Sequence, residues 1–114
     1  DVKDDMTIVQ EEIFGPVVII LKVADLEEAL DIINDHKYGN GAVIYTESGY
    51  YARKFKLEVQ AGMVGVNIGV PAPVAYFPFG GDKASQFSHI DAQGKAAFCF
   101  FTKEKTITSR FWAG

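Results

Sequence analysis

Cysteine is almost absent from this sequence, and its 114 residues contain no long apolar run. The single cysteine, Cys99, excludes an intrachain disulfide framework and a cysteine-rich zinc site, and it fits a reducing compartment. The longest apolar run, Val17–Leu21, is far shorter than the roughly 20 residues that a membrane-spanning helix needs. We therefore expect a soluble, cytoplasmic protein that does not enter a membrane.

Positive charge is also scarce. Lys and Arg number 11 against 15 Asp and Glu, which gives a formal net charge of −4. This balance and the lack of a long Lys/Arg run argue against nucleic-acid binding and against a polybasic membrane patch. What the chain does contain is 48% hydrophobic and 13% aromatic residues, which is enough for a folded core.

The first half of the chain has the pattern of an α/β protein. Val17–Val23 is a β-branched run typical of a strand covered on both faces. Asp25 is placed to cap a helix that ends near Tyr38-Gly39, with Glu28 three residues after the cap. The apolar stripe of this helix is formed by Leu26, Ala29, Leu30 and Ile33.

The same pattern then repeats. Gly41–Thr46 is a second buried-strand run, Ser48 begins a second helix with Gly62 as its C-cap, and Met63–Asn67 is a third strand. The packed stripe of this second helix is Tyr51, Ala52, Phe55 and Val59. The order strand, helix, strand, helix, strand predicts a parallel α/β layer with right-handed crossovers.

The second half of the chain is less regular. Between Ile68 and Gly94, Pro71, Pro73 and Pro78 forbid continuous ladders, and Gly80-Gly81 permits unusual backbone angles. The run Gly80–Lys83 could either hold an anion or turn the chain. Ala97–Phe111 reads as a long edge strand. Because such an edge exposes unpaired backbone groups, we expect it to pair with a partner subunit.

The residues that most often carry chemistry give weak signals here. Cys99 has no neighbouring His, Lys or helix start, so we expect a core or half-buried thiol rather than a nucleophile. The two histidines, His36 and His89, lack metal-ligand spacing, and we expect no metal site. Glu11–Pro16 places carboxylates and an aromatic just before a buried strand, where ligands of α/β sheets often collect, although a solvated segment gives the same pattern.

The run Glu11–Val17 resembles a signature of the aldehyde dehydrogenase superfamily. The resemblance continues in register to the end of the chain through Tyr38–Thr46, Gln60–Asn67, Phe77–Gly81 and parts of Gly94–Thr108.

Within the superfamily, the chain is most similar to the CoA-acylating methylmalonate-semialdehyde dehydrogenases. Three segments carry this similarity: Tyr38–Gly41, Val70–Pro73 and Thr106–Phe111. Ala84–Ser88 lacks the Ser-Gly and Arg-Glu pattern that follows the Gly-Gly turn in non-acylating relatives, and Asp82 is unusual at its position.

The resemblance implies roles for four residues. It assigns Glu12 to the hydroxyls of the nicotinamide ribose of NAD and Phe14 to the nicotinamide end of that cofactor. It assigns Phe79, with Phe77 beside it, to the channel that admits the aldehyde. CoA is implied as the co-substrate of the intact enzyme.

The resemblance also shows what these residues lack. The nucleophilic cysteine, the oxyanion-hole asparagine and the nucleotide-binding domain of the family lie upstream of the matching segment, so we expect no catalytic residue here. We read the chain, which starts at Asp1 in mid-pattern, as an inactive C-terminal fragment. Its expected parts are residues 1–96 of the catalytic domain and an oligomerisation strand and tail, residues 97–114. The alternatives are a stand-alone module for self-association or partner binding, and a fragment of a non-acylating aldehyde dehydrogenase.

Overall fold

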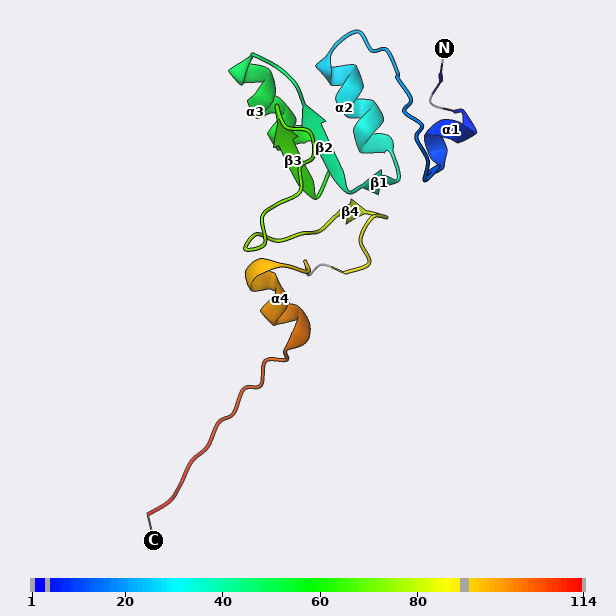
Figure 1. Cartoon of the computed structure of the whole chain (residues 1–114). Coiled ribbons are helices and arrows are strands. Elements are labelled where there is room, and N and C mark those ends of the chain that lie inside the picture. Colours follow the sequence, from blue (N-terminus) through cyan, green and yellow to red (C-terminus); the bar gives the residue numbers. More distant parts are fainter. Residues whose placement is uncertain (1, 4, 89–90, 114) are drawn as a thin grey trace.

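Two helices and a pair of parallel strands pack together toward one end of the molecule (Figure 1). The computed structural model describes residues 2–3, 5–88 and 91–113. The elements in chain order are α1 (Thr7–Gln10), α2 (Leu26–Asp35), β1 (Tyr38–Gly39), β2 (Gly41–Ile44), α3 (Gly49–Glu58), β3 (Met63–Val66), β4 (Asp82–Lys83) and α4 (Gly94–Phe101).

Helix α2 begins where its capping residues predict. The Asp25 carboxylate accepts a hydrogen bond from the backbone N–H of Glu28 at 3.0 Å, and the Glu28 carboxylate accepts one from Ala24 N–H at 2.7 Å. The helix ends at Asp35, before the expected Tyr38-Gly39, because those two residues form β1. Ser48 likewise caps α3, and its hydroxyl accepts from Tyr51 N–H at 3.3 Å.

The parallel pair of the predicted layer is confirmed. Strands β2 and β3 pair in parallel, from Gly41 opposite Met63 to Ile44 opposite Val66. Gly62 is not the C-cap of α3, because that helix already ends at Glu58 and Val59 is its extended C-cap. Gly62 instead lies against Gly80 and Gly81, where the lack of a side chain lets the two backbones approach.

The core between these elements is small. Leu30 of α2, Phe55 of α3 and Val59 pack together with exposed fractions of 3%, 2% and 9%. Partly buried apolar residues surround this cluster: Leu26, Ile33, Ala42, Ile44 and Ala61. On the surface above the core, Lys54 of α3 contacts Glu27 of α2 at 2.6 Å, and this hydrogen-bonded ion pair lowers the pKa of Glu27 and raises the pKa of Lys54.

The first expected strand does not form. In the described residues, Val17–Val23 belongs to no strand, and Val18 and Ile20 are largely exposed. A β-branched run becomes a strand only when a neighbouring strand completes its backbone hydrogen bonds, and no such neighbour lies beside it here. The observed fold is therefore mixed α/β with one parallel pair, rather than a three-stranded layer.

The C-terminal strand also needs correction. Residues 97–101 belong to helix α4, and residues 102–113 continue as a single extended segment that joins no described sheet (Figure 1). Lys95, Ala96 and Ala97 favour a helix start, so the helix outcompetes the β-propensity of the phenylalanines that follow. Cys99 lies exposed on α4, so the expectation of a core or half-buried thiol is wrong.

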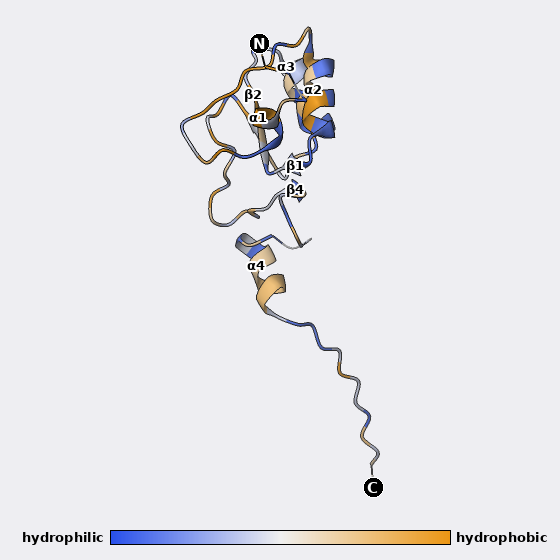
Figure 2. Cartoon of the chain, turned by 90° about the vertical axis from the view of Figure 1, so that its right-hand side faces the viewer, coloured by the Kyte–Doolittle hydropathy of each residue, from blue (hydrophilic) through white to orange (hydrophobic). Residues whose placement is uncertain are grey.

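The molecule is elongated. Its extents are 83 × 34 × 23 Å and its radius of gyration is 20.1 Å, whereas a compact domain of this length has a radius of about 13 Å. Figure 2 shows α4 as a predominantly apolar helix that lies outside the N-terminal lobe, residues 26–66. None of the helices in the described ranges is both long and apolar enough to cross a membrane.

Candidate functional site

Glu12 lies just after α1 and faces two cavities. The first, of about 480 Å³, is bounded by residues of α1, of the segment after α2, and of the segment after β4. Its lining beside Glu12 is Val9, Gln10, Glu11, His36, Tyr38, Asn40 and Ser85. The second, of about 390 Å³, joins Glu12 to the stretch from Ile13 to Gly15. The Glu12 side chain is exposed, so its carboxylate is open to a ligand in either cavity.

Phe14 lies in the second cavity with its ring 90% exposed. Its backbone has a φ of 51°, in the left-handed region that residues other than glycine rarely adopt. The turn continues at Gly15, whose carbonyl accepts a hydrogen bond from Val17 N–H at 2.7 Å. The apolar ring of Phe14 and the carboxylate of Glu12 therefore line the same cavity.

Phe77 and Phe79 occupy a separate segment, between β3 and β4. Phe77 N–H donates to the Val74 carbonyl at 2.9 Å, and the Phe79 carbonyl accepts from Ala92 N–H at 3.2 Å. Both rings are exposed. Neither lines the two cavities that Glu12 faces, so the structure brings Glu12 and Phe14 together but does not place the channel pair with them.

The C-terminal end of α2 connects the segment that holds Glu12 with the segment that holds Phe77 and Phe79. The sequence did not predict this connection. The Lys83 ammonium donates to the carbonyls of Ile33 and His36 at 2.9 Å and of Asn34 at 3.1 Å. In the structure, Asp82–Lys83 form β4 and the chain turns after them, at Ala84-Ser85, while the Lys83 cation is bonded to backbone carbonyls rather than open to an anion. The presence of a lysine after Gly80-Gly81 was visible in the sequence, but its three partners were not.

Asn34 and His36 extend this connection. The Asn34 side chain donates to the Glu58 carbonyl at 2.9 Å and accepts from Gln60 N–H at 2.8 Å, which ties α2 to the end of α3. The His36 ring contacts Tyr38 N–H at 3.2 Å and the Val9 carbonyl at 3.3 Å. These bonds give His36 a structural role in the wall of the Glu12 cavity.

The remaining candidates add no ligand site. In the described part of the chain, no group of three or more His, Cys, Asp or Glu residues could hold a metal ion. His89 lies outside the described residues. Cys99 is on α4 and does not line either cavity at Glu12.

Comparison with known proteins gives a consistent picture across nearly the whole chain. Residues 1–107 match the model of the aldehyde dehydrogenase family. Malonate-semialdehyde dehydrogenase 1 from Geobacillus kaustophilus is 51% identical over 110 residues, which cover 96% of this chain and 22% of that relative. The chain therefore spans less than a quarter of the length of the curated relatives it matches.

Solved structures agree with the sequence match. A methylmalonate-semialdehyde dehydrogenase from Oceanimonas doudoroffii is 49% identical with a TM-score of 0.93, over 99% of this chain and 23% of that one. A protein from Sinorhizobium meliloti 1021, provisionally assigned the same activity and complexed with NAD, is 46% identical with a TM-score of 0.94, over 100% of this chain and 23% of that one.

Proposed function

The chain belongs to the aldehyde dehydrogenase family, and from this premise we propose that its residues form the C-terminal part of an NAD-dependent, CoA-acylating (methyl)malonate-semialdehyde dehydrogenase. The observation that carries the proposal is the 51% identity to a malonate-semialdehyde dehydrogenase over 96% of this chain. The proposed intact enzyme oxidises a semialdehyde to an acyl-CoA with loss of carbon dioxide.

The residues at the Glu12 cavities fit one end of NAD. A carboxylate has two oxygens that can each accept a hydrogen bond, which suits the two neighbouring hydroxyls of a ribose. The exposed ring of Phe14 beside it offers an apolar face to the planar nicotinamide. When bound, NAD supplies the acceptor for the hydride of the aldehyde; Glu12 and Phe14 bind and orient it.

Phe77 and Phe79 are proposed to line the aldehyde channel. Their exposed rings, and the apolar surface around them, suit a wall that is completed by the rest of a longer chain. The single cysteine, Cys99, lies on α4 and outside the Glu12 cavities. Because these 114 residues hold no cysteine beside the proposed cofactor site, we expect them alone to show no turnover.

A chimeric enzyme tests this proposal. The matching segment of the Geobacillus kaustophilus malonate-semialdehyde dehydrogenase is replaced by this chain, and NAD reduction is measured with malonate semialdehyde, with and without CoA. We expect CoA-dependent turnover, no turnover by the 114 residues alone, and a KM for NAD raised about tenfold by Glu12→Gln, which keeps the shape but removes the charge-assisted hydrogen bonds.

The unmodified relative is the control for the assay. A folded chimera with no turnover would contradict the dehydrogenase proposal. Turnover that does not depend on CoA would instead support the non-acylating alternative. An unchanged KM for NAD in the Glu12→Gln variant would show that Glu12 does not bind the cofactor.

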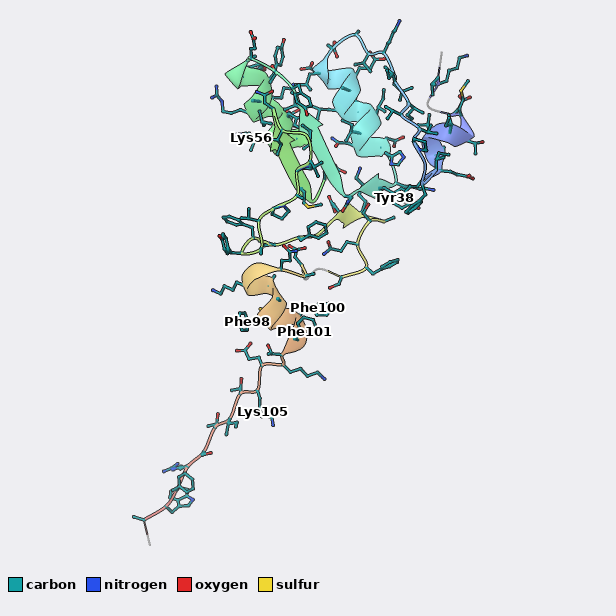
Figure 3. The ribbon with its side chains drawn as sticks, viewed as in Figure 1. Tyr38, Lys56, Phe98, Phe100, Phe101 and Lys105 are labelled. Carbon is teal, nitrogen blue, oxygen red and sulfur yellow. The ribbon has the colours of Figure 1, made fainter. Side chains whose placement is uncertain are left out.

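Self-association is a second proposed property, favoured by the exposed phenylalanines of α4. Phe98, Phe100 and Phe101 are all exposed, and the extended tail after them has no strand partner within the described chain (Figure 3). We propose that Ala97–Phe111 mediates homo-oligomerisation through the exposed phenylalanines of α4 and the extended segment, rather than through one continuous strand.

Light scattering tests the oligomer. We expect a particle of at least twice the 12.5 kDa chain mass, shifted toward the monomer by Phe101→Asp because a buried carboxylate in an apolar interface is costly. Phe87→Asp is the matched control, since Phe87 is also exposed but lies outside α4. A monodisperse monomer of the unmodified chain would refute the proposal.

A further inference from the structure

Lys83 uses all of its hydrogen-bonding capacity at one helix end. An ammonium group has three N–H donors, and the structure gives three carbonyl acceptors, those of Ile33, Asn34 and His36. The last carbonyls of a helix lack partners within the helix and lie at the negative end of its dipole. A half-buried lysine in this position satisfies them and neutralises their partial charge.

The backbone around Lys83 is also bound to the residues that follow α2. Strand β4 pairs antiparallel with β1, with Lys83 opposite Tyr38 and Asp82 opposite Gly39. Beyond β4, Ala84 N–H donates to the Lys37 carbonyl at 3.1 Å, and the Ser85 hydroxyl accepts from Gly39 N–H at 3.1 Å. Since Phe79 is four residues before Lys83, this anchor fixes the C-terminal end of the aromatic segment.

His36 connects the end of α2 with α1, the helix that precedes Glu12. Tyr38 N–H donates to Nδ1 of His36 at 3.2 Å, and Nε2 of the same ring lies within hydrogen-bond distance, 3.3 Å, of the Val9 carbonyl oxygen. Val9 is in α1, and Glu12 follows two residues after that helix ends. The end of α2 thus contacts the Glu12 segment through His36 and the Phe79 segment through Lys83.

We propose that Lys83 is a positioning residue that holds the cofactor-binding and channel segments in one geometry, by fixing the C-terminal end of α2 between them. It acts through backbone carbonyls and His36, and it touches neither ligand. An anion-binding role for Lys83 is disfavoured because its three donors are already used. The inference rests on the proposed function, since it assigns Lys83 to the same site.

The kinetic test uses the chimera with Lys83→Met, which keeps the aliphatic length and removes the charge and the donors. Misplacement of both segments is expected to raise the KM for NAD and the KM for the semialdehyde, each about tenfold, with kcat per folded enzyme changed less. A purely structural role would lower the folded fraction and leave both KM values unchanged, and that result would overturn the proposal. Lys56→Met, at an exposed lysine on α3, is the matched control (Figure 3).

A second measurement does not depend on activity. Hydrogen exchange of the 114-residue chain with Lys83→Met is expected to speed up both at Glu11, which donates to Thr7, and at Gly81, which donates to Gln86. Faster exchange confined to residues 81–85 would overturn the proposal. An inactive unmodified chimera would refute the proposed function, and the exchange result would then decide the role of Lys83 by itself.

Discussion

Phe55→Ala is expected to lower the free energy of unfolding by about 3–5 kcal/mol, which is the usual cost of removing a buried phenylalanine ring. Phe55 is 2% exposed and packs against Leu30 and Val59, so its loss opens a cavity between α2 and α3. Urea unfolding followed by far-UV circular dichroism measures the change. The loss is a large share of the core, since the buried apolar residues in the described part of the chain are Leu30, Phe55, Val59 and Met63.

The control for this prediction lies on the same helix. Leu57 is 83% exposed, so Leu57→Ala should leave the free energy of unfolding within about 0.5 kcal/mol of the original. Phe55→Leu should fall between the two, because it removes fewer carbon atoms from the core. Equal effects of Phe55→Ala and Leu57→Ala would show that the α2–α3 contact does not stabilise the chain.

Gly62→Ala is expected to destabilise the chain by about 1–3 kcal/mol through overpacking. A Cβ at this position would lie 2.5 Å from the Gly80 carbonyl oxygen and 2.6 Å from the Gly81 backbone, and backbone atoms cannot rotate away as a side chain can. The Phe77–Gly81 segment must then move off the start of β3. The same urea titration detects the change.

Gly49→Ala is the matched control, since a Cβ there meets nothing within 4 Å and Gly49 is the first residue of α3. It should be neutral or slightly stabilising, because alanine favours the helix. A Gly62→Ala variant as stable as Gly49→Ala would mean that the close approach of Gly62 to Gly80 is not needed.

The predictions that held depend on neighbouring residues in the sequence. Asp25 and Ser48 cap their helices through atoms three residues away, and the periodicity that follows needs only the local chain. Val17–Val23 failed as a strand because a strand is completed by a neighbour, which no local pattern can supply. At Ala97 the helix propensity of a few residues outweighed the strand propensity of the next ones.

Contacts between residues distant in the sequence were also missed at the candidate site. Glu12 and Phe14 were assigned through the resemblance, and the structure places them together in one cavity. Lys83 could not have been found in this way, because its three carbonyl partners lie 47 to 50 residues away. Every residue has a backbone carbonyl, so the residue types do not indicate which ones bind the lysine. Only the folded arrangement brings the Lys83 ammonium to the carbonyls at the end of α2.

The parallel pair β2–β3 has a consequence for the order in which the chain folds. Every residue of its core, from Leu26 of α2 to Val66 of β3, lies within one stretch of sequence that is complete before Phe77 or Lys83 is synthesised. Because chains emerge from the ribosome N-terminus first, the lobe can assemble while the later segment is still being made. We therefore expect the Lys83 ammonium to bind the carbonyls at the end of α2 after that helix has formed.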